Sequence, residues 1–398
     1  MIGILHAYSS HNAGDGLLVE LTLRRLAGVG VEPRDVVLVA LDPGSFVEPG
    51  TLAGEVRHRY PMGTPSRARG VNVVGAAMRG AGLAMPSLLR LPAGRVARAL
   101  GRCRALVAVG GGYLQARDAV SSAGVALNHL PQLVAAARHR GPTLYLPQSV
   151  GPLRGPAGAA VRRTLRAVDT VCVRDRWSED DLAGLPGVCR VPDLAVLDLA
   201  DHAGEIDRVA AGGAVGFVAR QVAHAPGYED HVVAVARAVG DGALWPVQAG
   251  GDDTKSDAVH YRRLGVEPAG RLTDLLAAQR LSVVVSVRLH GALMALRAGV
   301  PAIHLAYDRK GPAAFADLGL DEWCLDVRSL DRDHLGAAVK DLAADPAPYW
   351  RRFDERVADL GAASRRLDAL MAAAVRGQPG TPAGWSAGGD RLRARPQP

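Results

Sequence analysis

Short, uninterrupted apolar runs alternate with longer segments of helical periodicity along most of the chain. Such runs, rich in Val, Leu and Ala and without polar alternation, are typical of strands that are buried on both faces of a parallel sheet. Their alternation with helices predicts the α/β class, in which helices cover parallel sheets. We expect a first series of strands at 2–7, 35–41, 105–109, 143–147, 169–173 and 188–191, and a second at 214–219, 243–248, 283–286 and 300–305.

The two series of strands predict two domains. The 398 residues exceed the length of about 250–300 residues at which one hydrophobic core usually stops growing. We predict an N-terminal Rossmann-like domain over 1–197 and a C-terminal Rossmann-like domain over 198–347. Apolar residues at helical spacing predict a long helix over 348–376. The tail 377–398 is rich in Gly, Pro and Arg, and we expect it to be disordered.

The composition excludes several classes of protein. Hydrophobic residues make up 48% and charged residues 22%, values close to the soluble globular average that exclude a mostly disordered chain. Because no apolar run reaches about 18 residues, we expect no membrane-spanning helix. No secretory signal is visible, so we expect a cytoplasmic protein. The cysteines lack metal or disulfide spacing, which predicts neither a zinc site nor a disulfide framework; they are Cys103, Cys172, Cys189 and Cys324.

The net charge of +7 comes mostly from arginine, since only Lys255, Lys310 and Lys340 are lysines. A basic solvated surface is the commoner explanation, but arginine also suits phosphates, carboxylates and lipid headgroups. We expect no nucleic-acid partner. The arginine-containing segment 60–100 is interpreted either as a helical connection outside the first domain or as an amphipathic insertion. The second interpretation would give peripheral membrane contact through 60–100, at the inner face of the membrane.

Candidate site residues are those that follow the apolar runs, because ligands of open α/β sheets bind beyond the carboxyl ends of the strands. Asn12, Gly14 and Asp15 follow the first strand, and Asp15 is expected to cap a helix that begins near Leu17. Free backbone N–H groups in the first turn of that helix would suit an anion. These three residues are therefore candidates for substrate binding.

Glycines after the strand at 105–109 indicate a close approach of the backbone to a ligand or to a neighbouring helix. Gly110, Gly111 and Gly112 do not form the G-x-G-x-x-G pattern, and no acidic residue follows at the dinucleotide-binding distance, so NAD binding is disfavoured. Gln148 ends the next strand in a similar position. Gly111, Gly112 and Gln148 join the candidates for substrate binding.

Two arginines leave predicted strands in the two domains. Arg174 follows the strand 169–173, where it would either clamp an anion or form a salt bridge with Asp175, while Ser178 is expected to cap the next helix. Arg220 poses the same question at the end of 214–219. Both alternatives stay open for both arginines.

The strongest pattern is Arg288 and His290, which an apolar strand delivers into the turn before a predicted helix over 292–298. Arginine supplies a permanent positive fork, and histidine can carry a proton near neutral pH. Tyr307 and Lys310 follow the next strand and could border the same site. Two such residues in one ligand-facing turn favour a functional role over a structural histidine.

In this order, these residues resemble the polysaccharide pyruvyl transferase family. The family pattern runs from Asn-x-Gly-Asp through three glycines, a strand-ending Gln, Arg-Asp-x-x-Ser, an Asp and Arg-x-His to Gly-x-Pro and Tyr-x-x-Lys. No single element is specific, but their ordered co-occurrence is. The chain shows the pattern over residues 3–320 as Asn12/Gly14/Asp15, Gly110 to Gly112, Gln148, Arg174/Asp175/Ser178, Asp193, Arg288/His290, Gly299/Pro301 and Tyr307/Lys310.

The resemblance implies a GT-B-like architecture, in which two Rossmann-like domains face a cleft, the first on the acceptor side and the second on the donor side. It implies phosphoenolpyruvate as the donor substrate, a sugar or glycan as the acceptor, a pyruvate ketal as the product, and no further cofactor. Arg174 and Arg288 would clamp the donor's carboxylate and phosphate, and His290 would be the general acid. Arg220, Tyr307 and Lys310 would complete the substrate-binding residues.

Two other interpretations stay open at this stage. A nucleotide-sugar glycosyltransferase or epimerase of the same architecture would also use a glycine-rich first loop and basic residues in the second domain. A non-catalytic, anion-binding scaffold would use the basic segment 60–100 at a membrane surface. The sequence does not decide whether an acceptor would be lipid-linked.

Overall fold

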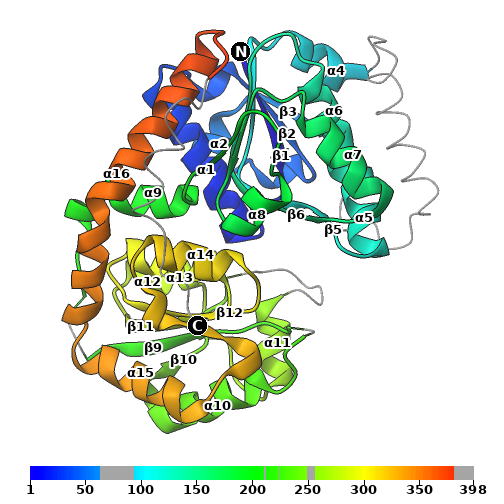
Figure 1. Ribbon diagram of the computed structural model, residues 1–398. Helices are drawn as coiled ribbons and strands as arrows, with labels where there is room; N and C mark the ends of the chain where they lie inside the picture. Colours follow the sequence, from blue (N-terminus) through cyan, green and yellow to red (C-terminus); the bar gives the residue numbers. More distant parts are fainter. Residues whose placement is uncertain (63–93, 210–211, 223, 249–255, 381–398) are drawn as a thin grey trace. The chain divides into compact units, whose positions relative to one another are not determined.

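The computed structural model describes residues 1–62, 94–209, 212–222, 224–248 and 256–380. The chain divides into two compact units. The first comprises Met1–Ser10, Asp15–Leu194 and Ala363–Pro398, and the second comprises His11–Gly14 and Ala195–Ala362. Each unit is built on its own parallel sheet (Figure 1), which confirms the predicted α/β class with two parallel sheets.

The first sheet has the strand order β3-β2-β1-β4-β6-β7-β8, and β5 pairs with β6. All its pairings are parallel, and the central strands are buried along their whole length, as continuous Val, Leu and Ala runs require. The strands are β1 (Ile2–Ala7), β2 (Val36–Ala40), β3 (His58–Pro61), β4 (Ala105–Ala108), β5 (Gly111–Ala116), β6 (Thr143–Leu153), β7 (Thr170–Val173) and β8 (Val188–Arg190).

Helices lie on both faces of the first sheet (Figure 1). α4 shows why: Val96, Ala99 and Leu100, spaced for one helical face, are buried in the core beneath the sheet, while its arginines stay outside that core. The helices of this unit are α1 (Ala13–Gly28), α2 (Leu52–Glu55), α4 (Gly94–Gly101), α5 (Ala119–Gly124), α6 (Leu130–Ala137), α7 (Gly155–Leu165), α8 (Arg176–Asp181) and the second half of α16 (Ala347–Val375).

The second sheet has the order β10-β9-β11-β12-β13, and all its pairings are parallel. Figure 1 shows α10 and α15 on one side of this sheet and α12, α13 and α14 on the other. The strands are β9 (Ala214–Val218), β10 (Ala243–Leu244), β11 (Leu281–Ser286), β12 (Ala302–Ala306) and β13 (Cys324–Asp326). The helices are α9 (Leu194–Asp201), α10 (Tyr228–Val239), α11 (Asp257–Arg263), α12 (Leu272–Ala277), α13 (Leu289–Arg297), α14 (Lys310–Asp317) and α15 (Arg332–Ala344).

Three strands were not predicted. β3 and β13 are short edge strands with partly exposed residues, and β5 begins with two glycines, so none of them presents a buried apolar run. The predicted strand at 243–248 is two residues long, Ala243–Leu244. In β3 and β13, edge position and short length remove the apolar pattern on which the prediction depends. At 243–248 the apolar run is present, but only its first two residues pair with the neighbouring β9.

The division between the units falls between Leu194 and Ala195, close to the predicted boundary at 197. α16 extends over Ala347–Val375, and its residues from Ala363 onward belong to the first unit, where Asp368 accepts a 2.6 Å hydrogen bond from Arg25. Most of the predicted insertion 60–100, namely 63–93, and the tail from 381 onward lie outside the described residues. The predictions of membrane contact and of disorder fall on those segments.

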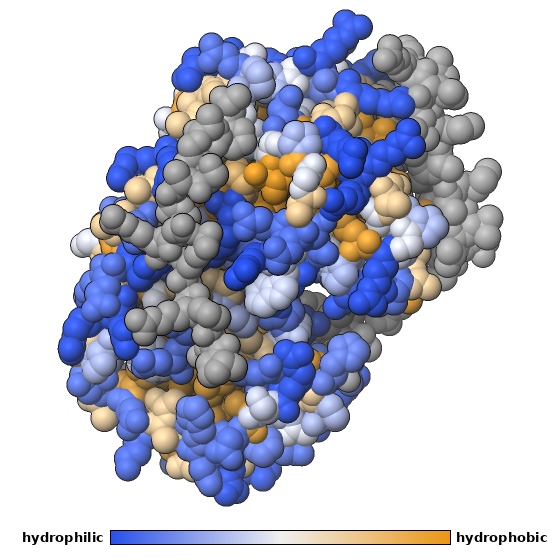
Figure 2. Space-filling view, in the orientation of Figure 1, coloured by the Kyte–Doolittle hydropathy of each residue, from blue (hydrophilic) through white to orange (hydrophobic). Residues whose placement is uncertain are grey.

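In the part of the chain that the structure describes, no helix has the length and apolar character that crossing a bilayer requires. The face of the molecule in Figure 2 is mostly hydrophilic, and its hydrophobic residues form small, separate patches. The four cysteines are free thiols. Cys172 and Cys189 are buried neighbours on β7 and β8, with their Sγ atoms 3.7 Å apart.

Candidate functional site

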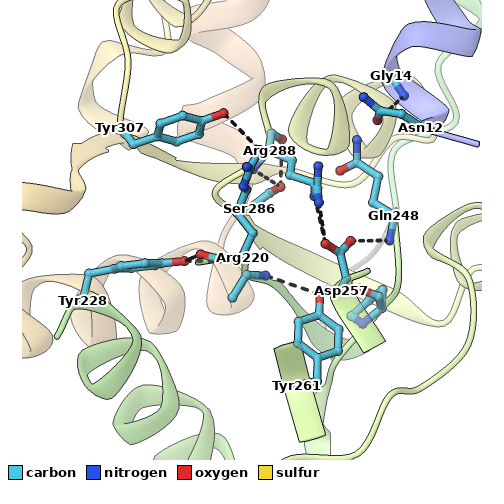
Figure 3. A network of polar contacts seen from close by, with 12 residues as sticks. Asn12, Gly14, Arg220, Tyr228, Gln248, Asp257, Tyr261, Ser286, Arg288 and Tyr307 are labelled. Atoms are coloured by element: carbon cyan, nitrogen blue, oxygen red, sulfur yellow. Dashed lines mark hydrogen bonds and ion pairs between the residues drawn. The ribbon is translucent and has the colours of Figure 1, made fainter. Parts of the chain in front are cut away.

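The carboxyl ends of three adjacent strands in the second unit bring the strongest candidates together. β11 lies between β9 and β12, with Ser286 paired to both Val218 and His304. Arg220 follows β9, Arg288 and His290 follow β11, and the Tyr307–Lys310 turn follows β12. Because parallel strands end at one edge of their sheet, residues far apart in sequence form one polar network there (Figure 3).

Arg288 is held in place by a buried carboxylate. Its Nε and Nη2 donate to Oδ1 of Asp257 at 3.1 and 2.6 Å, and Asp257 is fully buried while the Arg288 side chain is 12% exposed. Charge-assisted hydrogen bonds of this kind fix the plane of the guanidinium. Nη1 forms no hydrogen bond with any described residue. Asp257 thus orients the Arg288 guanidinium through Nε and Nη2, and the N–H groups of Nη1 are left to donate to an anion.

His290 lies in the first turn of α13, which begins at Leu289 with Arg288 as its N-cap residue. This corrects the predicted helix start at 292. The histidine is half-buried, and a Cβ placed on Gly14 would lie 2.6 Å from its Nδ1. Gly14 therefore permits a close approach of backbone and imidazole that any other residue would obstruct. Its segment, His11–Gly14, belongs to the second unit.

The remaining cations of this edge gather around Tyr307. The guanidinium carbon of Arg220 lies 5.6 Å from the centre of the Tyr307 ring, and Lys310 Nζ lies 5.8 Å from it. Lys310 also pairs with Asp308 at 3.2 Å. In the described part of the chain, no carboxylate forms an ion pair with Arg220, whose Nη1 is 3.5 Å from the Tyr307 hydroxyl. Arg220 is thus a cation available to an anionic ligand.

Neither Asp257 nor Gln248 was predicted, although both border Arg288. Asp257 Oδ2 accepts a 3.0 Å hydrogen bond from the backbone N–H of Gln248. His260, one turn further along α11, has its pKa lowered, mainly by burial and further by the nearby arginines. Gln248 ends the predicted strand 243–248, so the strand-end rule could have found it. Asp257 begins α11 further along the chain, where no strand end marks it.

Arg174 forms a buried ion pair in the first unit, and its partner is Asp193, not the predicted Asp175. The two side chains are 3% and 1% exposed, and Arg174 Nε also donates to Ser149 Oγ at 3.0 Å. Asp175 instead caps α8 by accepting from the Ser178 backbone N–H at 2.8 Å. The N-cap of α8 is therefore Asp175, and the predicted cap, Ser178, is the residue whose backbone N–H it accepts. The interpretation of Arg174 as an ion-pair residue is supported, with a different acid.

The glycine turn of the first unit makes a close backbone approach. A Cβ on Gly110 would lie 2.5 Å from the carbonyl oxygen of Pro147, so glycine is required there for packing between neighbouring strands. Gly111 of β5 pairs with Gln148, and Gly112 is exposed. The prediction that Gln148 ends its strand was wrong, because β6 continues to Leu153. Gln148 is fully buried, and neither polar atom of its side chain has a hydrogen-bond partner among the described residues. Buried amides without partners are rare and point to a bound group.

The first loop holds its candidates by local contacts. Asn12 Oδ1 accepts a 3.3 Å hydrogen bond from the Gly14 backbone N–H. Asp15 lies inside the first turn of α1, which begins at Ala13 and not near Leu17. The prediction of Asp15 as an N-cap was therefore wrong, because the helix starts before it.

A cluster of buried rings in the first unit was also not predicted. His6 Nδ1 and His129 Nδ1 are 3.3 Å apart, His6 Nε2 is 3.0 Å from the Tyr145 hydroxyl, and Tyr113 stacks on both imidazoles. Burial lowers the pKa of His129 to about 4 and that of His6 well below its ordinary value. His6 has a φ of 63°, which is unusual for a residue other than glycine. Its strand position predicted only an apolar core residue.

The chain is similar to known proteins in sequence pattern and in fold. The family model described as polysaccharide pyruvyl transferase matches residues 12–309. No curated protein shows significant sequence similarity to the chain.

Solved structures with the same fold include three that are very distant in sequence. The UDP-GlcNAc 2-epimerase of Methanocaldococcus jannaschii is 11% identical with a TM-score of 0.54, covering 93% of this chain and 99% of its own. The MnaA–UDP complex of S. aureus is 12% identical with a TM-score of 0.52, covering 96% and 98%. The epimerase of Neisseria meningitidis bound to UDP-GlcNAc is 11% identical with a TM-score of 0.51, covering 93% and 99%. At these identities the likeness shows the GT-B fold alone.

Proposed function

The chain belongs to the polysaccharide pyruvyl transferase family, and on this premise we propose that it transfers the pyruvyl group of phosphoenolpyruvate to a sugar of a cell-surface polysaccharide or its precursor. The product is a pyruvate ketal that joins two hydroxyls of the sugar. The observation that carries the proposal is the placement of Arg288, with one donor edge available, beside Arg220 and the His290 turn on one sheet edge.

Donor binding follows from charge. Phosphoenolpyruvate carries a carboxylate and a phosphate, and Arg288 and Arg220 offer guanidinium donors from adjacent strands. Asp257 orients Arg288 and leaves Nη1 for the ligand. Lys310 adds a third positive charge beside Tyr307. Arg174 is not assigned to the donor here, because its guanidinium pairs with Asp193 and donates to Ser149 inside the first unit.

His290 supplies the proton in the proposed reaction. It protonates the methylene carbon of the donor, which generates cationic character at C2, and a sugar hydroxyl attacks that carbon and loses its proton. The bond from C2 to the phosphate oxygen then breaks, and phosphate leaves with the electron pair. A second hydroxyl of the sugar adds to C2 and loses its proton, which closes the ketal.

The acceptor is proposed to bind at the first unit, beyond the carboxyl end of β4 and beside the middle of β6, where Gly111 pairs with Gln148. Gly111, Gly112 and the unpartnered amide of Gln148 would contact sugar hydroxyls there, since a carboxamide offers a donor and an acceptor side by side. Asn12, Gly14 and Asp15 belong to the loop that follows β1. The reaction would take place in the cytoplasm, and at the inner face of the membrane if the acceptor is lipid-linked.

A ligand comparison tests the proposal. Thermal unfolding is measured with phosphoenolpyruvate and with a panel of UDP-sugars; a ligand at 100 times its dissociation constant stabilises the fold by about 2.7 kcal/mol. Phosphate release is then followed with phosphoenolpyruvate and a panel of hexosides. Stabilisation by a UDP-sugar with indifference to phosphoenolpyruvate would replace the donor assignment with that of a nucleotide-sugar enzyme.

Two variants separate the roles in this site. His290→Ala should retain phosphoenolpyruvate binding and lose turnover by about 10²–10⁴-fold, the usual contribution of a general acid. Arg288→Ala should weaken donor binding first. His334→Ala and Arg332→Ala, which change exposed residues at the start of α15, are the matched controls and should leave both properties unchanged.

A further inference from the structure

Gln248 places a buried amide next to the Arg288 site. The residue is 7% exposed, and its Oε1 is buried and accepts no hydrogen bond from any described residue. Hydrophobic packing at this position would be served as well by leucine or methionine, so the amide of Gln248 requires another reason.

A glycine on the neighbouring helix accommodates this amide. A Cβ on Gly291, in the first turn of α13, would lie 2.2 Å from Gln248 Oε1 and 2.9 Å from Ser286 Oγ. Gly291 is not among the residues with a positive φ, so its backbone does not require glycine. Glycine inside a helix costs roughly 0.5–1 kcal/mol relative to alanine. The missing side chain of Gly291 therefore serves to make room for Gln248.

One carboxylate couples this amide to the arginine. Asp257 Oδ2 accepts from the Gln248 backbone N–H at 3.0 Å, and its Oδ1 accepts from Arg288. In Figure 3 the Gln248 side chain extends alongside the guanidinium of Arg288. The buried Asp257 thus fixes the position of the glutamine relative to the donors of the arginine. Oε1 packs against Gly291, and the hydrogen bond that Gln248 donates to a described residue is that of its backbone N–H, so the two N–H groups of Nε2 remain as donors.

We propose that Gln248 is a substrate-contacting residue that determines donor specificity: its Nε2 donates a hydrogen bond to an oxygen of the anion that Arg288 binds. Asp257 is a positioning residue for both. The chemical class of the ligand is a small carboxylate or phosphate, and the identification with phosphoenolpyruvate rests on the proposed function. The charge of a guanidinium attracts any anion. A neutral carboxamide donor beside it favours anions that place an oxygen in line with its N–H group, and this adds specificity.

Calorimetry on the full chain tests the inference with two replacements of nearly equal size. Gln248→Met removes the donor and Gln248→Glu replaces it with a negative charge, while both still fill the space above Gly291. A hydrogen bond to a charged group contributes about 1.5–3 kcal/mol, so Gln248→Met should weaken phosphoenolpyruvate binding roughly 10- to 100-fold. Gln248→Glu should weaken it further by repulsion. The melting temperatures of both variants should stay near that of the wild type.

Alanine at 291 separates ligand contact from packing. Gly291→Ala should displace the amide and weaken binding like Gln248→Met. Gly336→Ala on α15, where the new Cβ would make only an ordinary contact of 3.9 Å with Val235, is the control. In the double variant Gln248→Ala/Gly291→Ala the new methyl group has room, so stability should return but donor affinity should not. Full recovery of affinity in the double variant would reduce Gln248 to a packing residue and overturn the inference.

The outcomes for the inference and for the proposed function differ. If the wild type binds phosphoenolpyruvate and Gln248→Met binds it equally well, the inference fails and the function stands. If the wild type binds only a UDP-sugar or inorganic phosphate, the function fails, and the same variants measured with that anion decide on Gln248. A wild type that binds none of these three probes overturns both.

Discussion

Removing the charge of Asp193 should destabilise the first unit more than any surface change, because the buried Arg174 then loses its direct carboxylate partner and reaches the next one, Asp175, only through the Ser149 hydroxyl. The Arg174 and Asp193 side chains are 3% and 1% exposed, and the neutral Ser149 hydroxyl is the other recorded partner of the guanidinium. Breaking a buried pair by removing one partner costs about 3–5 kcal/mol. Asp193→Asn keeps the size of the side chain, so this cost reflects the lost charge and not a cavity.

Differential scanning calorimetry measures the effect. A unit of this size loses about 2–4 °C of melting temperature per kcal/mol, so Asp193→Asn should lower the transition of the first unit by roughly 6–20 °C. Because the chain has two units, each transition must be fitted separately. The control is Asp333→Asn, which breaks an ion pair whose side chains are 60% and 84% exposed and should change stability by no more than about 0.5 kcal/mol.

A double variant checks the physical reasoning. Replacing both partners with apolar residues, Arg174→Met/Asp193→Leu, should recover most of the lost stability, since such replacements of buried pairs are often neutral. A loss below about 1 kcal/mol for Asp193→Asn would show that water reaches the guanidinium. A double variant as unstable as the single one would show that shape, and not charge, dominates at this position.

Two further outcomes are expected. Gly14→Ala should displace His290, because the His290 Nδ1 would lie 2.6 Å from the new Cβ. Turnover should fall at least tenfold with little loss of melting temperature. Gly28→Ala, at the open end of the same helix, is the control, and equal turnover in both variants would contradict the contact. Burial lowers the pKa of His129 and of His304 to about 4. Below pH 6.5 the unfolded chain therefore binds more protons than the folded chain. The free energy of unfolding should be highest above pH 6.5 and should fall on acidification by up to about 1.4 kcal/mol per histidine for each pH unit. Urea unfolding at pH 7.5, 6.0 and 5.0 measures this, His304→Gln should flatten the dependence, and a flat wild-type curve would refute it.

The strand ends were predictable because buried parallel strands leave a continuous apolar pattern. Ile2–Ala7, Ala105–Ala108 and Thr170–Val173 follow the predicted runs closely, and the residues beyond them are therefore at the edge where ligands bind. The starts of the helices were less predictable. The helices at Ala13 and Leu289 begin four and three residues before their predicted starts, because only the backbone hydrogen bonds decide where a helix begins.

Partners of charged residues were not predictable from neighbourhood in sequence. Arg174 is adjacent to Asp175, but the strand directs its side chain to Asp193, while Asp175 turns to the backbone of α8. In the same way Arg288 finds Asp257, which follows a strand of two residues. The pairing depends on which loops the sheet order brings together, and the order β10-β9-β11-β12-β13 is not the order of the chain.

By itself, the sequence determined the α/β class and the places of most strands, because burial on both faces of a sheet dictates local composition. Only the tertiary structure decided which residues act together. Asp257 orients Arg288, and the missing side chain of Gly291 leaves room for the neighbouring Gln248. His6 and His129 are in contact although 123 positions separate them in the chain. Such contacts depend on direction and distance between side chains, and the folded backbone sets both.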